Sequence, residues 1–402
     1  MRILHTADWH LGKRLDNFSR LEEQQAVLAE ICRIAEEQKV DMVIVAGDLF
    51  DTFNPPIEAT ELLYKTLKRL SRNGKVPAIA IAGNHDSPDR INVADVLARE
   101  NGIIFIGHPT DKITAFELEE GFKITRSETG FVEFKLPEIE FPVRVIHTAF
   151  ANEVRLKEYF GEDKQLSLQG SLAKKWQKSA DDFCDEKGVN VLTTHLYMLK
   201  RGGEILEEPE GEKPLNIGNA DVVYSDAVPA SIQYVALGHL HRYQDVGSNQ
   251  PVIYSSSPLA YSFSEAGQQK YVAIVDLKPG ETARIEKIPL QSGRRLERKT
   301  FDEVKKAESW LLENPDTLVE LTIESDTFLT AEERRILFQA HDGIIFLIPK
   351  VRSTTINERP SGTEINLNQD METLFKEYFQ SRNKGQVPNE ELMNLFNEMR
   401  SI

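Results

Sequence analysis

Five separated blocks of Asp, Asn and His residues hold the side chains that could do chemistry in this 402-residue sequence. Each block directly follows a short apolar run, so each would lie at the end of a predicted strand. Carboxylate, amide and imidazole groups together are suitable ligands for divalent ions such as Mn²⁺, whereas thiolates favour softer ions. In chain order the blocks are Asp8-x-His10, Gly47-Asp48-x-x-Asp51, Gly83-Asn84-His85-Asp86, Thr194-His195 and Gly238-His239-x-His241.

Seven side chains in these blocks are predicted metal ligands. Asp8 and His10 can face one ion if the backbone after the strand is not strictly pleated. Asp48 is a carboxylate that can bridge two ions, and the pair His239 and His241 gives one ligand to each ion. Taken alone, each residue type is more often a cap, a turn or a buried structural histidine, but together they predict a two-metal site. The seven predicted ligands are Asp8, His10, Asp48, Asn84, His195, His239 and His241.

Two divalent ions held about 3.5–4 Å apart lower the pKa of a bridging water and clamp phosphoryl oxygens during in-line displacement. The predicted reaction is therefore hydrolysis of a phosphoester without a covalent intermediate. The sequence contains no recognisable Ser-His-Asp or Cys-His arrangement and no phosphate-binding Walker loop. We therefore do not expect the chain to hydrolyse ATP by itself.

The elements that must position these blocks alternate between short β-rich runs and helical patterns. Such an alternation predicts an α/β fold with its site at the strand ends. Past residue 279 the motifs stop, and a second, smaller α/β pattern follows up to residue 352. The predicted strands before the blocks are Ile3–Ala7, Met42–Ala46, Ala78–Ala82, Val189–Leu192 and Tyr234–Leu237, and the first helices span about Leu21–Gln38 and Ile57–Arg72.

The sequence divides into four predicted segments: 1–278, 279–352, a polar linker at 353–368, and a helical region at 369–402. Two short amphipathic helices are expected in the last segment, at about Met371–Arg382 and Asn389–Met399. Short helices need a surface to pack on, and that surface is either their own domain or a groove on a partner.

The formal net charge of -16 argues against a broad basic surface for nucleic acid on this chain alone. Nucleic acid is still compatible with it, because bound metals neutralise part of the charge and a partner could supply a positive groove. Cys32 and Cys184 lie far apart and predict no disulfide. Neither a signal peptide nor an apolar run long enough to span a membrane is recognisable, so we expect a cytoplasmic protein with no membrane contact.

Together the five blocks resemble the signature of the calcineurin-like metallophosphoesterases. The residues around them, in particular Thr6 to Gly12, Gly47 to Asp51, Gly83 to Ser87 and Tyr234 to His241, are similar to the SbcD family, the nuclease subunits of bacterial SbcCD complexes. The resemblance covers nearly the whole chain. It implies a metallophosphoesterase β-sandwich flanked by helices in 1–278, a small α/β capping domain for DNA recognition in 279–352, and a C-terminal helix pair in 369–402 that binds an SbcC-like ATPase.

The resemblance also implies roles for the block residues. His85 would lie outside both metal ligand sets and act on the reacting phosphate as the catalytic histidine. Two ions, Mn²⁺ or alternatively Mg²⁺, would serve a double-strand 3'-5' exonuclease and single-strand or hairpin endonuclease of DNA repair, recombination and replication. A homodimer within a heterotetramer is implied. One ion would be bound by Asp8, His10, Asp48 and His241, and the other by Asp48, Asn84, His195 and His239.

Several features stay open in the sequence. Asp51 stands where archaeal and eukaryotic relatives often have histidine, and Ser256 replaces a frequent glycine. Arg14 and Arg90 could contact a DNA phosphate or form ordinary surface ion pairs. The basic residues between 294 and 306 fit a phosphate-binding strip or, slightly better, a solvated charged face.

Alternative functions also remain. A helical face with Leu62, Leu63 and Leu67 could serve dimerisation or core packing. A small-molecule phosphodiesterase or a phosphatase would use the same core. A non-catalytic scaffold is disfavoured because His85 and all seven ligands are present.

Overall fold

The computed structural model describes residues 1–159, 164–208, 222–247, 249–327, 329–351 and 371–382, together with Pro388, Met393 and Phe396. The chain forms two units, Met1–Val351 and Arg352–Ile402, and each is described by itself. No helix in the described part of the chain is long and apolar enough to cross a bilayer.

The first sheet of the larger unit has six strands in the order β17-β16-β1-β4-β5-β6. Four of them, β1, β4, β5 and β6, run parallel, as expected when helices connect successive strands. β16 and β17 extend the sheet in antiparallel fashion on the other side of β1. The strands are β1 (Arg2–Thr6), β4 (Met42–Val45), β5 (Ala78–Ile81), β6 (Ile103–Ile106), β16 (Tyr271–Asp276) and β17 (Arg284–Pro289).

The second sheet has seven strands in the order β14-β15-β13-β10-β9-β8-β7. Its centre, from β15 through β13 and β10 to β9, is parallel, and β7, β8 and β14 are antiparallel additions. The strands are β7 (Lys123–Glu128), β8 (Phe131–Lys135), β9 (Val143–Thr148), β10 (Val189–His195), β13 (Tyr234–Gly238), β14 (Gln244–Asp245) and β15 (Val252–Tyr254).

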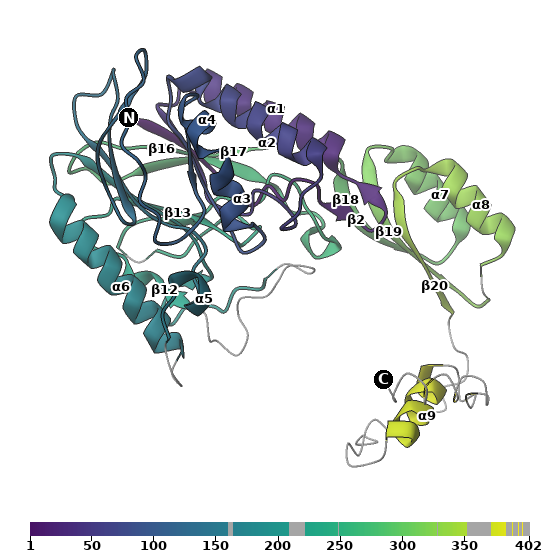
Figure 1. Cartoon of the computed structure of the whole chain (residues 1–402). Helices are drawn as coiled ribbons and strands as arrows, with labels where there is room; N and C mark the ends of the chain where they lie inside the picture. Colours follow the sequence, from purple (N-terminus) through teal and green to yellow (C-terminus); the bar gives the residue numbers. More distant parts are fainter. Residues whose placement is uncertain are drawn as a thin grey trace. The chain divides into compact units, whose positions relative to one another are not determined.

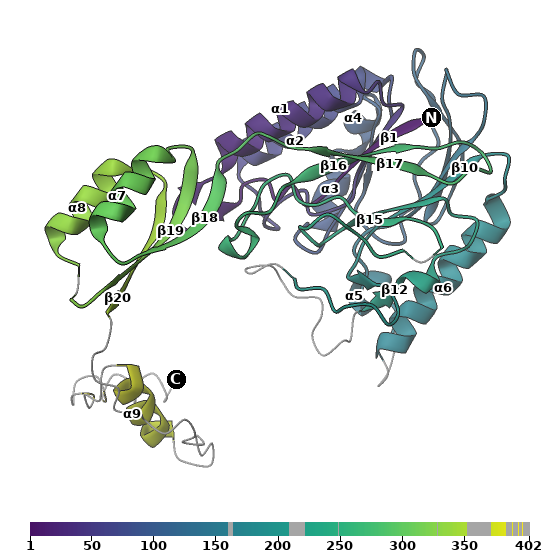
Figure 2. The same ribbon diagram turned by 180° about the vertical axis from the view of Figure 1, so that it is seen from behind.

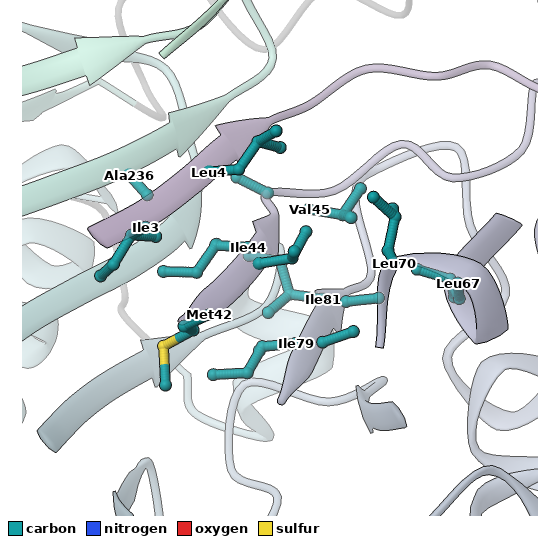
Figure 3. Packing of buried hydrophobic residues seen from close by; sticks show 14 of the residues in the cluster. Ile3, Leu4, Met42, Ile44, Val45, Leu67, Leu70, Ile79, Ile81 and Ala236 are labelled. Carbon is teal, nitrogen blue, oxygen red and sulfur yellow. The ribbon is translucent and has the colours of Figure 1, made fainter. Parts of the chain in front are cut away.

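The two sheets pack face to face around one apolar core that contains side chains from both. Helices α1 (Leu21–Glu37) and α2 (Ile57–Leu70) lie along one side, and α6 (Lys164–Phe183) lies along the other (Figures 1 and 2). Figure 3 shows side chains of β1, β4 and β5 gathered with Leu67 and Leu70 of α2. The predicted α/β sandwich with flanking helices is therefore confirmed.

Shorter elements complete the connections of the larger unit. Leu63 and Leu67 of α2 are buried in the core, so packing and not dimerisation explains them. The short elements are β2 (Arg14–Leu15), β3 (Phe18–Ser19), η1 (Arg72–Gly74), α3 (Pro88–Val93), α4 (Asp95–Arg99), α5 (Glu153–Leu156), β11 (Met198–Leu199), β12 (Val223–Tyr224), η2 (Ser225–Ala227) and η3 (Phe263–Glu265).

A separate three-stranded parallel sheet follows, in the order β18-β19-β20, with its own apolar core. Helices α7 and α8 cover one of its faces (Figures 1 and 2). Strand β17, at 284–289, still belongs to the six-stranded sheet, so that sheet continues past residue 278. The elements of the small sheet unit are β18 (Arg295–Phe301), α7 (Val304–Glu313), β19 (Thr317–Ser325), α8 (Ala331–Ala340) and β20 (Ile344–Val351).

The C-terminal unit contains helix α9 (Met371–Arg382). Its Phe375 stacks on Phe396, with ring centroids 4.2 Å apart and planes 11° apart. Apolar side chains of this unit therefore pack on one another. The predicted linker 353–368 lies outside the described residues, as does most of the predicted helix Asn389–Met399.

Candidate metal centre

The five blocks meet where strands of the two sheets end. Asp8 and Asp48 follow the neighbouring parallel strands β1 and β4, while His195 ends β10 and His239 follows β13 in the second sheet. Hydrogen bonds join the sheets at this place. His239 N donates to Asp8 Oδ1 at 2.8 Å, and His195 Nδ1 lies 2.9 Å from the carbonyl oxygen of Ala46.

The backbone at four of the predicted ligands is left-handed. The φ angles are 54° at Asp8, 43° at His10, 47° at Asp48 and 109° at His239. Such values are uncommon for residues with a side chain and cluster at functional sites. They break the alternation of a strand, which is how Asp8 and His10, only two residues apart, turn toward the same place.

One group of side chains gathers around His10. The Nε2 atoms of His10 and His241 are 3.1 Å apart, and Asp48 Oδ2 lies 3.5 Å from His10 Nε2. Ligand atoms of Asp8, His10 and His241 all lie within 4.8 Å of one another, as an ion would require.

A second group gathers around His195. Its Nε2 lies 2.9 Å from Asn84 Oδ1 and 3.3 Å from Asp48 Oδ2. Ligand atoms of Asp48, His195 and His239 lie within 4.8 Å of one another. Asp48 is thus the residue whose carboxylate is near both groups.

Both groups are buried, and their electrostatics are those of a cation site. Burial opposes ionisation of Asp48, but His195 and His10 overcome that cost and hold its pKa below the ordinary value. Burial likewise opposes protonation of His195, yet Asp48 and Asp8 raise its pKa to about 9. The buried Oδ2 atoms of Asp8 and Asp48 accept no hydrogen bond from the described residues. Buried carboxylate oxygens that accept no such hydrogen bond and lie beside imidazole nitrogens are suitable ligands for divalent metal ions.

His85 lies beside the first group without being part of the predicted ligand set. Its backbone N–H donates to Asp48 Oδ1 at 2.9 Å, and its Nδ1 lies 2.8 Å from the carbonyl oxygen of Asp51. The ring centroid is 4.9 Å from that of His10. The side chain of His85 is therefore oriented by the backbone of a neighbouring block.

Residues 1–243 match the calcineurin-like phosphoesterase family. Over 410 aligned positions the chain is 37% identical to the D subunit of nuclease SbcCD from Bacillus subtilis (strain 168), with 100% of this chain and 98% of that protein covered. The chain belongs to the SbcD family of calcineurin-like phosphoesterases. Proteins of the same name from Staphylococcus epidermidis and Rhodobacter capsulatus are each 32% identical, over 74% and 71% of this chain and 71% and 68% of theirs.

Two solved structures are similar at low identity. A putative 5'-nucleotidase from Staphylococcus aureus has a TM-score of 0.40 and 14% identity, over 85% of this chain and 58% of that chain. The protein TT1561 of Thermus thermophilus has a TM-score of 0.38 and 12% identity, over 72% of this chain and 99% of that chain.

Family membership confirms the resemblance found in the sequence. It makes the chain a metal-dependent phosphodiester hydrolase, as predicted, and implies divalent metal ions as its cofactors. The buried carboxylates and imidazoles gathered at the strand ends are consistent with that chemistry.

Asp86 and Arg155 hold the third block in place, and the sequence predicts this role for neither of them. Asp86 accepts backbone hydrogen bonds from Leu49, Phe50 and Gly83 at 2.8–2.9 Å, and thereby ties the second block to the third. Arg155 donates to the carbonyl oxygens of Gly83 and Asp86 at 2.8 and 2.9 Å. Asp86 is visible within its motif, but Arg155 is 69 residues away from it and carries no sequence signal.

Asp51 and Ser256 have structural explanations. Asp51 Oδ1 forms a 2.9 Å ion pair with Lys13 and lies 3.7 Å from His10 Nδ1. Burial opposes ionisation of Asp51, but His10 and Lys13 lower its pKa. Ser256 has a φ of 78°, the region that favours glycine, and its hydroxyl is hydrogen-bonded to the backbone of Tyr271.

The arginines and lysines that could contact DNA are mostly engaged within the protein. Arg14 donates to the carbonyl oxygen of Asn17, and Arg90 is exposed on α3. In the basic cluster, Arg298 pairs with Glu320 at 2.8 Å and Arg294 with Asp342 at 3.2 Å. Lys306 pairs with Asp302 and Glu303. These contacts favour the interpretation of a charged, solvated face.

Proposed function

We propose that this chain is the Mn²⁺-dependent DNA nuclease subunit of a two-component complex. The observation that carries the proposal is Asp48 Oδ2, which lies 3.5 Å from His10 Nε2 and 3.3 Å from His195 Nε2. One carboxylate oxygen is thus near an imidazole nitrogen of each group, as a bridging ligand requires. The relatives named as the D subunit of nuclease SbcCD support a nucleic acid as the substrate.

The proposed ligand sets follow the two groups of side chains. Mn²⁺ is the preferred ion because imidazole and carboxylate ligands occur together, and Mg²⁺ is the alternative. One ion would be held by Asp8, His10, Asp48 and His241, and the other by Asp48, Asn84, His195 and His239.

The ions would supply a water of lowered pKa and hold the phosphoryl oxygens. Asp48 is fixed by the backbone N–H of His85 at Oδ1, so Oδ2 is the oxygen it presents to the site. The carbonyl of Asp51 can only accept a hydrogen bond, so Nδ1 of His85 carries a proton. Nε2 therefore faces the reaction, and His85 would have to carry a second proton there, as an imidazolium, to donate it to the leaving oxygen or to stabilise transition-state charge.

The proposed substrates are duplex DNA ends, cut by 3'-5' exonuclease action, and single-stranded or hairpin DNA, cut by endonuclease action. The setting is DNA repair, recombination and replication in the cytoplasm. An SbcC-like ATPase is the proposed partner, because the charge of -16 leaves a positive DNA surface to be supplied by another chain. Helix α9, with the half-buried Leu374, Phe375 and Phe379, is the proposed contact with that ATPase.

We keep the four-segment division as part of this proposal: a nuclease domain at 1–278, a capping domain at 279–352, a linker at 353–368 and an ATPase-binding region at 369–402. Strand β17, at 284–289, falls within 279–352 by number but pairs with β16, so we propose that it belongs to the nuclease domain and that the capping domain begins after it. The separate core of the β18–β20 sheet supports the capping domain.

The test is cleavage of linear duplex and hairpin DNA by the purified chain, with and without its ATPase partner, in the presence of Mn²⁺. Asp48→Ala should abolish cleavage because it removes the shared carboxylate, and His85→Ala should lower it by about 10²–10⁴-fold. His108→Ala is the matched control, since this imidazole pairs with the exposed Asp89 at 2.9 Å. Activity confined to small phosphodiesters or phosphomonoesters, even with the partner present, contradicts the proposal and favours a small-molecule phosphodiesterase or phosphatase.

A further inference from the structure

Glu265, at the end of η3, turns its side chain into the protein toward His241. Its carboxylate is 2% exposed, and its Oε1 lies 3.2 Å from His241 Nδ1. The other oxygen, Oε2, lies 2.5 Å from Lys270 Nζ. A buried carboxylate of this kind is held in place by its partners and not by solvent.

Lys270 and the η3 turn fix both Glu265 and His241. Lys270 Nζ also donates to the carbonyl oxygen of His241 at 2.8 Å, so it contacts the backbone of the residue whose ring Glu265 contacts. The backbone N–H groups of Tyr261 and Ser262 donate to Glu265 Oε1 at 3.0 and 3.2 Å. Glu265 is therefore held by Lys270 and by the backbone of Tyr261 and Ser262.

The hydrogen-bond chemistry determines which ring nitrogen of His241 bears the proton. An ion-paired carboxylate can only accept, so Nδ1 of His241 must donate. Nε2 then carries the lone pair, and this is the atom 3.1 Å from His10 Nε2. A carboxylate that holds a histidine in this way fixes the tautomer and ring orientation of a metal ligand.

We propose that Glu265 is a positioning residue of the metal centre, which holds the His241 imidazole with its Nε2 toward the ion bound by Asp8 and His10. This inference rests on the proposed function, because it takes His241 as a metal ligand. Glu265 itself contacts neither ion nor substrate.

The same turn joins the metal centre to the small sheet unit. Two residues before Glu265, Phe263 is buried in a cluster with Leu296 of β18 and Leu318 of β19, and its ring lies 5.8 Å from that of Phe346 on β20. All three strands of the small sheet thus contact the turn that carries Glu265. The η3 turn therefore contacts the small sheet through Phe263 and His241 through Glu265.

The test is Mn²⁺ binding to the full chain, measured by isothermal titration calorimetry and by electron paramagnetic resonance of bound Mn²⁺. The informative variant is Glu265→Leu combined with Lys270→Met, because removing both charges leaves no buried charge unpaired. In this double variant we expect one of the two Mn²⁺ ions to bind about 10–100-fold more weakly than in wild type. Glu265→Gln should retain affinity within about fivefold, because its amide oxygen still accepts from Nδ1.

Two controls separate this inference from the proposed function. Glu30→Leu removes another buried carboxylate, one that accepts hydrogen bonds from the backbone of Gln291 and Ser292, and should leave both affinities unchanged. His241→Ala should weaken the binding of one of the two Mn²⁺ ions. Unchanged binding in His241→Ala overturns the ligand assignment itself, and the positioning role with it. Weakened binding in His241→Ala with wild-type binding in the Glu265/Lys270 double variant overturns the positioning role alone.

Discussion

Buried histidines in this protein fall into two groups with opposite surroundings. His195 lies beside Asp48 and Asp8, which overcome the cost of burial and raise its pKa to about 9. His5 and His147 are equally buried, and burial lowers their pKa to about 3 and about 4, although Asp111 offsets a small part of this effect at His147. The ring of His5 is hydrogen-bonded instead to a tyrosine hydroxyl and to a backbone carbonyl. Burial alone therefore does not mark a site histidine, whereas burial beside carboxylates does.

His147 provides a test at the residue scale. Its folded-state pKa of about 4 lies below the unfolded value near 6.5, so the unfolded chain binds the proton more readily between these values. Stability that is fully present above pH 6.5 should be lost as the pH falls toward 4, by roughly 3 kcal/mol.

His147→Leu should remove this pH-dependent part of the free energy of unfolding. Urea unfolding of wild type and variant between pH 4 and 7.5 measures it, because all other titrating groups are common to both. If the free energy of unfolding changed equally with pH in the two proteins, His147 would not be the source of the pH dependence.

The predicted ligands are recognisable in the sequence, and the residues that hold them in place are not. All seven predicted ligands and His85 lie together, because each ends or follows a strand whose apolar run is plain. Arg155 and Glu265 act through contacts with Gly83 and His241, 72 and 24 residues away. Such contacts depend on the tertiary fold, so neither residue stands out in a single sequence.

Among the elements, buried strands are predicted well from the sequence and exposed ones poorly. Met42–Val45 and Ala78–Ile81 are continuous apolar runs and form strands at those places. Strand β18, Arg295–Phe301, does not stand out as a strand because charged residues dominate it. Its Arg298 is stabilised by Glu320 on β19, a cross-strand ion pair that no local pattern reveals.

Turn η3 gives a prediction at the element scale. Phe263→Ala removes the ring that packs against the small sheet, and core truncations of this type cost about 3–5 kcal/mol. Because Glu265 is two residues away, one Mn²⁺ ion should also bind several-fold more weakly.

Phe122→Ala is the control for this change, since Phe122 is equally buried but packs against Phe116 and Phe134. It should lower the melting temperature and leave Mn²⁺ affinity unchanged. Equal Mn²⁺ affinities for wild type and Phe263→Ala would show that the turn does not connect the small sheet to the metal centre.

On the scale of the whole molecule, one exposed apolar face is formed by helices α3 and α4. Helices α3 and α4 carry Val93, Val96 and Leu97, which are 69–84% exposed. Exposed apolar residues on adjacent helices are typical of an interface. The family resemblance implies a homodimer, and we propose that two copies would meet at this face and not at the buried Leu63 and Leu67.

Val96→Asp with Leu97→Asp should convert the dimer into the 45.7 kDa single chain, measured by size-exclusion chromatography with light scattering. Two charges on each copy would have to be buried for the dimer to form. Leu312→Asp, an exposed apolar position on α7, should leave the mass of the dimer unchanged. An undiminished dimer in the Val96/Leu97 variant would place the interface elsewhere.

The most direct measurement of the central claim is the anomalous scattering of Mn²⁺ in crystals of the full chain. Two peaks should flank Asp48, one beside His10 and His241 and the other beside Asn84 and His195. Asp48→Asn crystals should lose occupancy at both. A wild-type map with one peak, or with no peak at these residues in a protein that still cleaves DNA, would contradict the two-metal account.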